Sequence, residues 1–185
     1  MRGQRMKRLA EEKAAGAKLK GNRSISGLSE LSNDKGVYTL VISMSVEKQI
    51  AIGKMGSRKF PEGYYAYTGS ALGKGATSLG GRILRHLRED KRKRWHIDYL
   101  LADDNVSIVT VIAAHTEEQS ECRINRLLRN ALQAEAPVSR FGSSDCHEGC
   151  GSHLLYLGRD KKVIRKIVEL YIEGMDAQVH VLEIS

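Results

Sequence analysis

The stretch from Gly36 to Met44 constrains the fold of this chain more than any other feature. It reads GVYTLVISM and is rich in β-branched residues. The large side chains that recur at every second position are Tyr38, Leu40, Ile42 and Met44. Because side chains alternate between the two faces of a strand, this period of two predicts a β-strand. We expect the ordered part of the chain to begin here.

Two more extended segments follow this strand along the chain. Glu47–Ile52 is expected to be a return strand, and Tyr64–Thr68 a third strand that Gly69 stops. Between them, Gly53–Gly63 contains Pro61 and is predicted to be a loop. Three short strands in succession indicate an antiparallel meander.

The hydrophobic period changes at about residue 76. Apolar residues now recur every three or four positions, which predicts an amphipathic helix over Thr77–Asp90. The remaining elements are expected at Val106–Ala113 (strand), Glu117–Ala134 (helix), Asp160–Glu173 (helix) and Gln178–Ile184 (strand). The fold class is therefore α+β, a small antiparallel sheet of three or more strands flanked by helices, with a C-terminal helix-strand extension.

These elements divide the chain into three parts. Residues 1–34 are basic with few large apolar residues, and we expect a flexible arm that contacts a polyanion backbone or is only a solvated tail. Residues 35–157 are expected to form the main domain. Residues 158–185 are expected to form the helix-strand extension.

Composition excludes several classes of protein. Of the 185 residues, 41% are hydrophobic, which is too many for a disordered chain. No apolar run approaches the roughly 20 residues that span a bilayer, and the basic N-terminal part lacks the apolar stretch of a secretory signal, so we expect a cytoplasmic protein with no membrane contact. Three cysteines, an odd number, do not make a disulfide framework. The net charge of +8 favours a polyanionic partner such as nucleic acid.

Two tripeptides that contain tyrosine and glycine lie at the ends of predicted strands. They are GVY at Gly36–Tyr38 and YTG at Tyr67–Gly69, and a helix with Arg82 and His86 follows. This order resembles the signature of the GIY-YIG nuclease superfamily, with a conservative change at the middle residue of each tripeptide. Glu121, on the next long helix, matches the metal-binding glutamate of that superfamily.

The resemblance is closer to one branch of the superfamily. The segments Phe60–Ala71, Trp95–Leu100 and Gly142–Leu154 look like those of the DUF123 family, also called Uri-type GIY-YIG proteins, which occur mainly in archaea and bacteria. The likeness covers about Lys35–Leu157. The two tripeptides are farther apart here than in most of the superfamily, because Val41–Tyr64 lies between them. An extra strand and loop in this segment would still let the two tyrosines meet.

The resemblance implies a metal-dependent endonuclease that hydrolyses phosphodiester bonds in DNA, in a repair- or recombination-like setting. It implies that Tyr38 is the general base, that Tyr67 forms hydrogen bonds around the nucleophile, and that Arg82 and His86 belong to the catalytic group. Glu121 would hold one Mg²⁺ or Mn²⁺ ion.

Elementary chemistry agrees with this set of residues. Phosphodiester hydrolysis needs an activated water and stabilised charge on the phosphoryl oxygens, which a guanidinium and a hard divalent cation supply. A free tyrosine titrates near pH ~10. Tyr38 would therefore need a metal-bound water or a nearby cation to lower its pKa.

Glu121 stands out within its predicted helix. It lies on the apolar stripe of Ile124, Leu128 and Leu132, where a carboxylate is costly unless it is paired or binds a metal. We therefore interpret Glu121 as a metal ligand, with Glu117, one turn earlier, as the competing residue. In the alternative interpretation Glu121 is exposed in the first turns, where the helix dipole favours it.

Several further residues are candidates for contact with nucleic acid. Gly69 is expected to allow a tight exit from its strand and to let a phosphate approach the backbone. His96 either contacts nucleic acid or caps a helix at whose start Trp95 packs. A run of four basic residues is the best candidate for contact with the phosphate backbone, although such a run is often only a solvated turn: Lys91, Arg92, Lys93 and Arg94.

A short segment near the end of the main domain is rich in metal-ligand types. Its members Cys146, His147, Cys150 and His153 have spacings suggestive of zinc, but structural zinc takes four ligands and neighbouring Cys146 and His147 are awkward to direct at one ion. The DUF123-like pattern shares Asp145, Cys146, Ser152 and His153. We therefore favour a loop that lines the cleft, with a zinc site and a purely structural role as the alternatives. We expect Cys122 to lie in the core.

Three functions stay open on the sequence. The leading hypothesis is the endonuclease, and the second is a nucleic-acid-binding module that has kept the fold but lost catalysis. The third is a protein-interaction or zinc-stabilised module. DNA is favoured over RNA as the partner. Because no sequence-reading module is attached, we expect recognition of nucleic-acid structure or weak sequence specificity.

Overall fold

The computed structural model describes residues 27–144, 146 and 148–184. Most of the predicted basic arm, together with Asp145 and His147, lies outside the described residues. The described fold begins before Gly36, because the short 3-10 helix η1 (Leu28–Leu31) buries both of its leucines in the core. No helix among the described residues combines the length and apolar character that a bilayer crossing requires.

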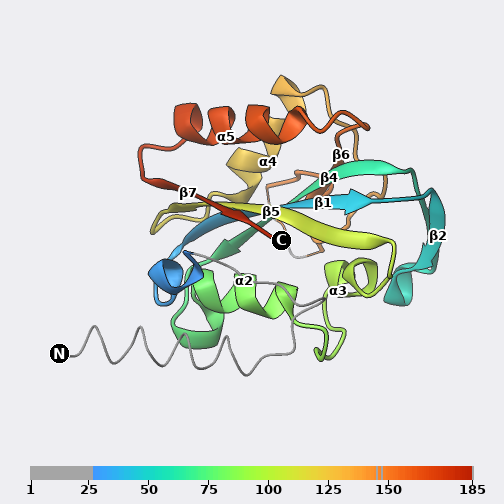
Figure 1. Ribbon diagram of the computed structural model, residues 1–185, viewed down its shortest axis with the longest axis horizontal. Helices are drawn as coiled ribbons and strands as arrows, with labels where there is room; N and C mark the ends of the chain where they lie inside the picture. Colours follow the sequence, from blue (N-terminus) through green and yellow to red (C-terminus); the bar gives the residue numbers. More distant parts are fainter. Residues whose placement is uncertain (1–26, 145, 147, 185) are drawn as a thin grey trace.

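A five-stranded antiparallel sheet forms the centre of the molecule (Figure 1). Its order is β6-β4-β1-β5-β7, so β1 is the central strand. The strands are β1 (Gly36–Met44), β4 (Gly63–Ala71), β5 (Val106–His115), β6 (Leu154–Tyr156) and β7 (Val179–Glu183). The predicted bounds of β1 are confirmed, and those of β5 are confirmed except that the strand runs two residues further. The short strand β6 was not predicted.

The predicted meander is wrong. β1 pairs along its whole length with β4 and β5, whereas β2 (Lys48–Ala51) pairs only with β3 (Ser57–Phe60) in a separate hairpin. The hairpin encloses the 3-10 turn η2 (Gly53–Met55), so the predicted loop contains a strand. β2 and β3 each bury a single side chain, and such short, exposed strands cannot serve as a central partner for a nine-residue strand. The extra strand and loop nevertheless leave the two tyrosine-bearing strands side by side.

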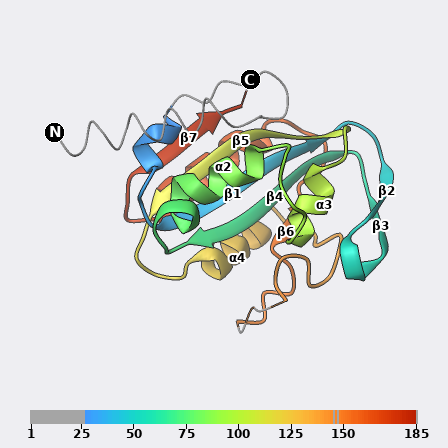
Figure 2. The ribbon, with the colours of Figure 1, turned by 90° about the horizontal axis from the view of Figure 1, so that it is seen from below.

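Helices cover both faces of the sheet (Figures 1 and 2). α2 and α3 lie below it in Figure 1, and α4 and α5 lie above it. The helices are α2 (Leu79–Leu87), α3 (His96–Leu101), α4 (Glu121–Ala131) and α5 (Val163–Gly174), and a further 3-10 turn, η3 (Gly75–Thr77), precedes α2. The helices predicted to begin at Thr77, Glu117 and Asp160 all start later. The α+β fold class is confirmed.

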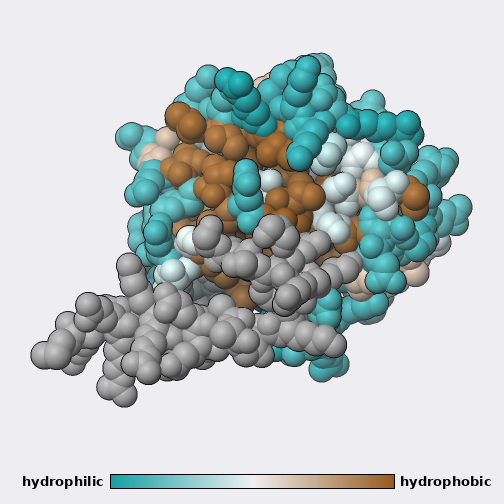
Figure 3. All heavy atoms as spheres, in the orientation of Figure 1, coloured by the Kyte–Doolittle hydropathy of each residue, from teal (hydrophilic) through white to brown (hydrophobic). Residues whose placement is uncertain are grey.

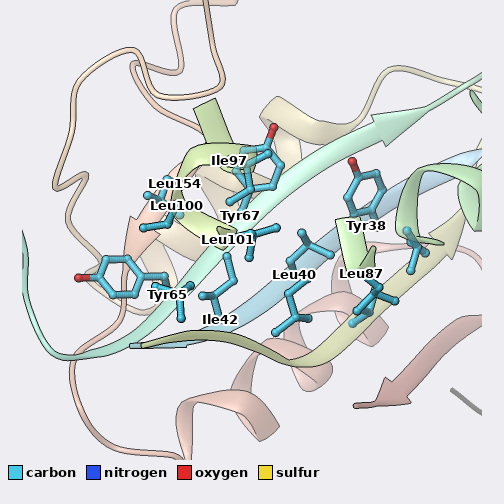
Figure 4. Packing of buried hydrophobic residues seen from close by; sticks show 14 of the residues in the cluster. Tyr38, Leu40, Ile42, Tyr65, Tyr67, Leu87, Ile97, Leu100, Leu101 and Leu154 are labelled. Atoms are coloured by element: carbon cyan, nitrogen blue, oxygen red, sulfur yellow. The ribbon is translucent and has the colours of Figure 1, made fainter. Parts of the chain in front are cut away.

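The alternation along β1 separates two hydrophobic cores. Tyr38, Leu40, Ile42 and Met44 lie on one face of β1, as predicted, and they share a core with α2, α3 and the hairpin (Figure 4). Val37 and Val41 face the other core, with Ile124 and Ile167 from α4 and α5. On that second face, the buried Thr39 hydroxyl lies 2.7 Å from the Tyr171 hydroxyl of α5. The C-terminal helix is thereby fixed to the central strand.

The face of the molecule seen in Figure 3 carries a group of apolar side chains. Figure 3 shows apolar side chains gathered where β7 and α5 lie in Figure 1, and Ile172 and Val181 of these elements are exposed. β7 is an edge strand of the sheet.

Candidate functional site

A cleft of about 570 Å³ brings together four of the five residues predicted to carry the chemistry, whereas the fifth, His86, lines a second hollow. Tyr38, Tyr67, Arg82 and Glu121 all line it, although they come from β1, β4, α2 and α4. The remaining lining residues are Gly69, Ser70, Leu72, Arg94, Trp95, His96, Gln119, Gly142, Ser144 and His153. The structure therefore places the predicted tyrosines, arginine and glutamate around one space.

Strand register positions the two tyrosines. Tyr38 lies directly opposite Gly69 in the β1–β4 pair, and Tyr67 lies opposite Leu40. The phenol oxygens of Tyr38 and Tyr67 point the same way in Figure 4, whereas that of Tyr65 points elsewhere. Positions two apart on a strand share a face, so this register puts both phenols on the same side of the sheet.

The role predicted for Gly69 as the strand exit is wrong, because β4 continues through it to Ala71. A Cβ atom at Gly69 would lie 2.6 Å from the Tyr38 hydroxyl oxygen and 2.7 Å from the ring carbon that carries it. A side chain at this position would therefore force the Tyr38 ring or β4 to shift. Glycine lets the Tyr38 phenol lie across β4 without that shift.

His86 contacts the hydroxyl of Tyr38. Its Nε2 atom lies 2.8 Å from the Tyr38 hydroxyl, and both residues are almost fully buried. Burial lowers the pKa of His86 to about 3, with the charge of Lys91 acting in the same direction. Burial raises the pKa of Tyr38 to about 12, although the charge of Arg82 acts against it. At neutral pH both groups are uncharged, and the imidazole Nδ1 atom has no hydrogen-bond partner among the described residues.

Two arginines on α2 have different surroundings. Arg85 donates to both carboxylate oxygens of Asp98 at 2.9 and 2.8 Å, and its guanidinium lies 3.9 Å from the centre of the Trp95 ring. Although burial raises the pKa of Asp98, hydrogen bonds from Arg85 and from two backbone N–H groups hold it below its usual value. Arg82 lines the cleft, and its buried Nε atom has no hydrogen-bond partner among the described residues.

Glu121 is the first residue of α4 and is 7% exposed. One carboxylate oxygen accepts a hydrogen bond of 2.8 Å from the Gln119 side chain, and the other is buried without a partner among the described residues. The competitor Glu117 precedes the helix, is exposed and pairs with Lys35, so it takes no part in the cleft. Gln119, which the sequence did not single out, orients the carboxylate. An unpartnered carboxylate oxygen at the wall of a cleft suits a hard divalent cation.

His96 belongs to the cleft wall. Its Nδ1 atom accepts a 3.1 Å hydrogen bond from the backbone N–H of Gly142, and its ring lies 5.6 Å from that of Phe141. Its neighbour Trp95 precedes α3 and packs against α2, where its ring lies 5.6 Å from that of His86. Burial lowers the pKa of His96.

The basic run divides between two places. Only Arg94 lines the cleft, whereas Lys91 and Lys93 line a second hollow of about 340 Å³ beside the end of α2. The Lys91 ammonium donates to the backbone carbonyl of His86. Arg92 is exposed and lines neither space. The four residues therefore have different surroundings, and the prediction that they contact a phosphate backbone remains a prediction.

Three cysteines and one histidine converge beside the cleft. The set, here called the Cys/His cluster, consists of Cys122, Cys146, Cys150 and His153, and its ligand atoms all lie within 4.8 Å of one another. All three cysteines are free thiols. The four residues could hold a metal ion. The prediction that Cys122 is buried is confirmed, but its sulfur faces the other ligands instead of packing only among apolar side chains.

The cluster and the cleft share one residue. His153 contributes a ligand atom to the cluster and also lines the cleft. Ser144, from the same segment, lines the cleft as well. The two interpretations of this segment, cleft loop and metal site, are therefore compatible in geometry. The signal that could have completed the set was Cys122, the remaining cysteine of the sequence, since structural zinc takes four ligands.

One protein-family model matches most of the chain. The family model described as "Domain of unknown function DUF123" matches residues 37–175, from β1 through α5. No curated protein and no solved structure matches the chain. The matched segment contains every cleft-lining residue and the whole Cys/His cluster. The chain belongs to the DUF123 family.

Proposed function

We propose that this protein is a metal-dependent endonuclease that hydrolyses phosphodiester bonds in DNA. One observation carries the proposal: two phenols, a guanidinium and a carboxylate from four separate elements line one cleft on a chain with net charge +8. The guanidinium, and a metal ion held by the carboxylate, can stabilise the charge that develops in phosphodiester hydrolysis, and positive charge favours a phosphate polymer. DNA is preferred over RNA on the resemblance to GIY-YIG nucleases alone.

Tyr38 is the proposed general base, and His86 holds its hydroxyl in place. With a pKa of about 12, Tyr38 is protonated at pH 7 and is a weak acid. Transfer of its proton to His86 would place a charge on a buried imidazole whose pKa is about 3, so His86 serves as a hydrogen-bond partner at 2.8 Å and not as the proton acceptor. The charge of Arg82 and a divalent ion at Glu121 would favour loss of the Tyr38 proton, and the phenolate so formed could accept a proton from the attacking water.

Arg82 is the group proposed to meet the phosphate. Its neighbour Arg85 is already neutralised by Asp98, so its charge is satisfied within the protein. Arg82 lines the cleft and holds a buried N–H donor that no described residue accepts. A guanidinium in that state can donate to phosphoryl oxygens as negative charge develops on them.

The protein offers oxygen ligands at one position and sulfur and nitrogen ligands at another, and these favour different metals. We propose that the Glu121 carboxylate binds one Mg²⁺ or Mn²⁺ ion, because its buried oxygen lacks a partner among the described residues and hard cations prefer oxygen. Such an ion would stabilise charge on the phosphoryl group. The Cys/His cluster offers three thiols and an imidazole, which favour zinc over magnesium.

The test compares cleavage by matched variants. Purified protein is incubated with duplex, flapped and branched DNA plus Mg²⁺ or Mn²⁺, beside Glu121→Gln and its control Glu117→Gln. We expect cleavage by the parent and by Glu117→Gln, and cleavage by Glu121→Gln that is slower by about 10²–10³-fold. Equal cleavage by both variants would contradict the role of Glu121. Salt-sensitive DNA binding with no cleavage by any form would refute the enzyme and leave a nucleic-acid-binding module.

A further inference from the structure

One wall of the cleft is a long segment with no regular structure of its own. From Val138 to His153, here called the cleft loop, the described residues form no helix or strand. Gly142, Ser144 and His153 of this loop line the cleft. Ordering such a segment costs roughly 1–2 kcal/mol per residue in backbone entropy alone. Something must hold the loop in place for this wall to exist.

Backbone contacts fix the two ends of the loop near the tyrosines. The Thr68 N–H donates to the His153 carbonyl at 3.1 Å, next to Tyr67 on β4. The His153 N–H donates to the Phe141 carbonyl at 2.8 Å. A Cβ atom at Gly142, where φ is +69°, would lie 2.7 Å from the Tyr67 ring. The loop therefore packs directly on one of the two phenols.

The middle of the loop is fixed by the Cys/His cluster. The Cys146 and Cys150 sulfurs lie 3.3 and 2.8 Å from that of Cys122, and the Cys150 sulfur lies 3.0 Å from the His153 ring nitrogen. Cys122 is in the first turn of α4, directly after Glu121 in the chain. The cluster thus joins the loop to the turn that presents the carboxylate.

We propose that a zinc ion bound by Cys122, Cys146, Cys150 and His153 positions the carboxylate side of the cleft. Three thiolates and one imidazole are a complete ligand set for structural zinc, with no coordination site left open for a substrate. The ion crosslinks the start of α4 to the cleft loop, so it fixes Glu121 and the loop wall against Tyr67. The cluster residues are positioning residues.

This inference rests on the proposed function for the meaning of the cleft, but the zinc centre can be measured without any nuclease assay. The protein has a single tryptophan, Trp95, and it lines the cleft. Its fluorescence reports the state of the cleft independently of cleavage. Since His96 holds the loop through Gly142, movement of the loop alters the surroundings of Trp95.

The experiment uses the full chain, purified without added metal. Elemental analysis is expected to find one zinc ion per chain in the parent and in the control His115→Asn, whose histidine lies outside cluster and cleft. Cys146→Ser is expected to lower zinc content at least tenfold, to change Trp95 emission and to open the cleft loop to proteolysis. Cys146→His, which restores a zinc ligand, is expected to recover these signals. Circular dichroism checks that the sheet and helices persist.

The outcomes separate this inference from the proposed function. Zinc-free parent protein, or Cys146→Ser protein with unchanged emission and protease resistance, would overturn the zinc centre. Zinc-free protein that still cleaves DNA at the parental rate would overturn the positioning role while the nuclease stands. Zinc-dependent emission with no cleavage of any DNA would support the positioning role and refute the nuclease.

Discussion

The two sides of the cleft are held by different kinds of interaction. On one side, Tyr38 and Tyr67 are fixed by strand register, and Arg82 and His86 by an amphipathic helix packed on the same sheet. On the other side, Glu121 stands at the first position of a helix, beside an irregular loop and a cluster of metal-ligand side chains. The first side therefore depends on packing, and the second on a few polar and sulfur contacts. Changes to the two sides should therefore have different signatures.

The largest expected effect on the cleavage rate comes from replacing one charged residue on each side of the cleft. Arg82→Gln is expected to reduce the cleavage rate by about 10²–10³-fold at every Mg²⁺ concentration, because it removes a donor to developing charge. Glu121→Gln is expected to reduce it by a similar factor and also to raise the Mg²⁺ concentration needed for half-maximal rate. The measurement is initial rate against Mg²⁺ concentration.

The control for this contrast is Arg88→Gln, which changes an arginine just beyond the end of α2 that pairs with Asp90 outside the cleft. It should leave both the rate and the Mg²⁺ dependence unchanged. If Arg82→Gln shifted the Mg²⁺ dependence and Glu121→Gln did not, the assignment of roles to the two sides would be reversed.

The next effect tests the packed side alone. In Gly69→Ala the new Cβ would lie 2.6 Å from the Tyr38 hydroxyl oxygen, so the ring or β4 must shift. We expect a loss of about 1–3 kcal/mol in the free energy of unfolding, as for other overpacked cores. Urea denaturation measures it, with Ser70→Ala on the same strand as the control. Tyr38→Ala would itself destabilise, but the double variant should lose less than the sum of the two single losses. Full additivity would show that the two residues do not collide.

The packed side was the more predictable one. A period of two along Gly36–Met44 gave the central strand with its bounds, and the helical period gave α2 with Arg82 and His86. The period of the apolar residues shows which face of a helix or strand is buried, so it predicts elements that pack on a core. The mistaken meander arose where that signal is weak, since β2 and β3 have mostly exposed side chains. Pairing partners are chosen by long-range packing, which local propensity does not contain.

The carboxylate side was less predictable for a related reason. Cys122 is a small buried residue on a helix, and burial alone gave it a place in the core. Its neighbours in the cluster are 24 or more positions away in the chain. Only the folded loop brings the four ligand atoms together. The helix start at Glu121 was also missed, because Thr116 and Ser120 are both residue types that favour a helix start and the sequence does not choose between them.

A smaller effect is expected from pH. The pKa of His86 is lowered to about 3 in the folded protein, against about 6.5 in the unfolded chain. Below pH 6.5 the unfolded state binds a proton that folded His86 does not, so stability falls as the pH falls. The slope for one group is at most about 1.4 kcal/mol per pH unit.

His86→Gln, which keeps a hydrogen-bond acceptor for Tyr38, should remove this acid sensitivity, whereas His115→Gln on the surface should retain it. Denaturation curves at pH 7.5, 6.5 and 5.5 measure the difference. An unchanged slope in His86→Gln would show that another group is responsible.

The smallest expected effect is on DNA binding, and it compares a basic residue inside the cleft with one outside it. Arg94 lines the cleft, whereas Lys93 is exposed outside it and lies 5.6 Å from the Tyr99 ring. A side chain that contacts phosphate releases about one counterion on binding, so its loss lowers the slope of log affinity against log salt by about one. We expect Arg94→Gln to weaken DNA binding a few-fold and to lower the slope, and Lys93→Gln to change neither. Fluorescence anisotropy with labelled duplex and flapped DNA at several salt concentrations measures both quantities.

If Lys93→Gln had the larger effect, DNA would lie over the end of α2, and the second hollow there would be the main contact surface. If both variants lowered the slope equally, the basic run would act as one patch, although only Arg94 of the four lines the cleft.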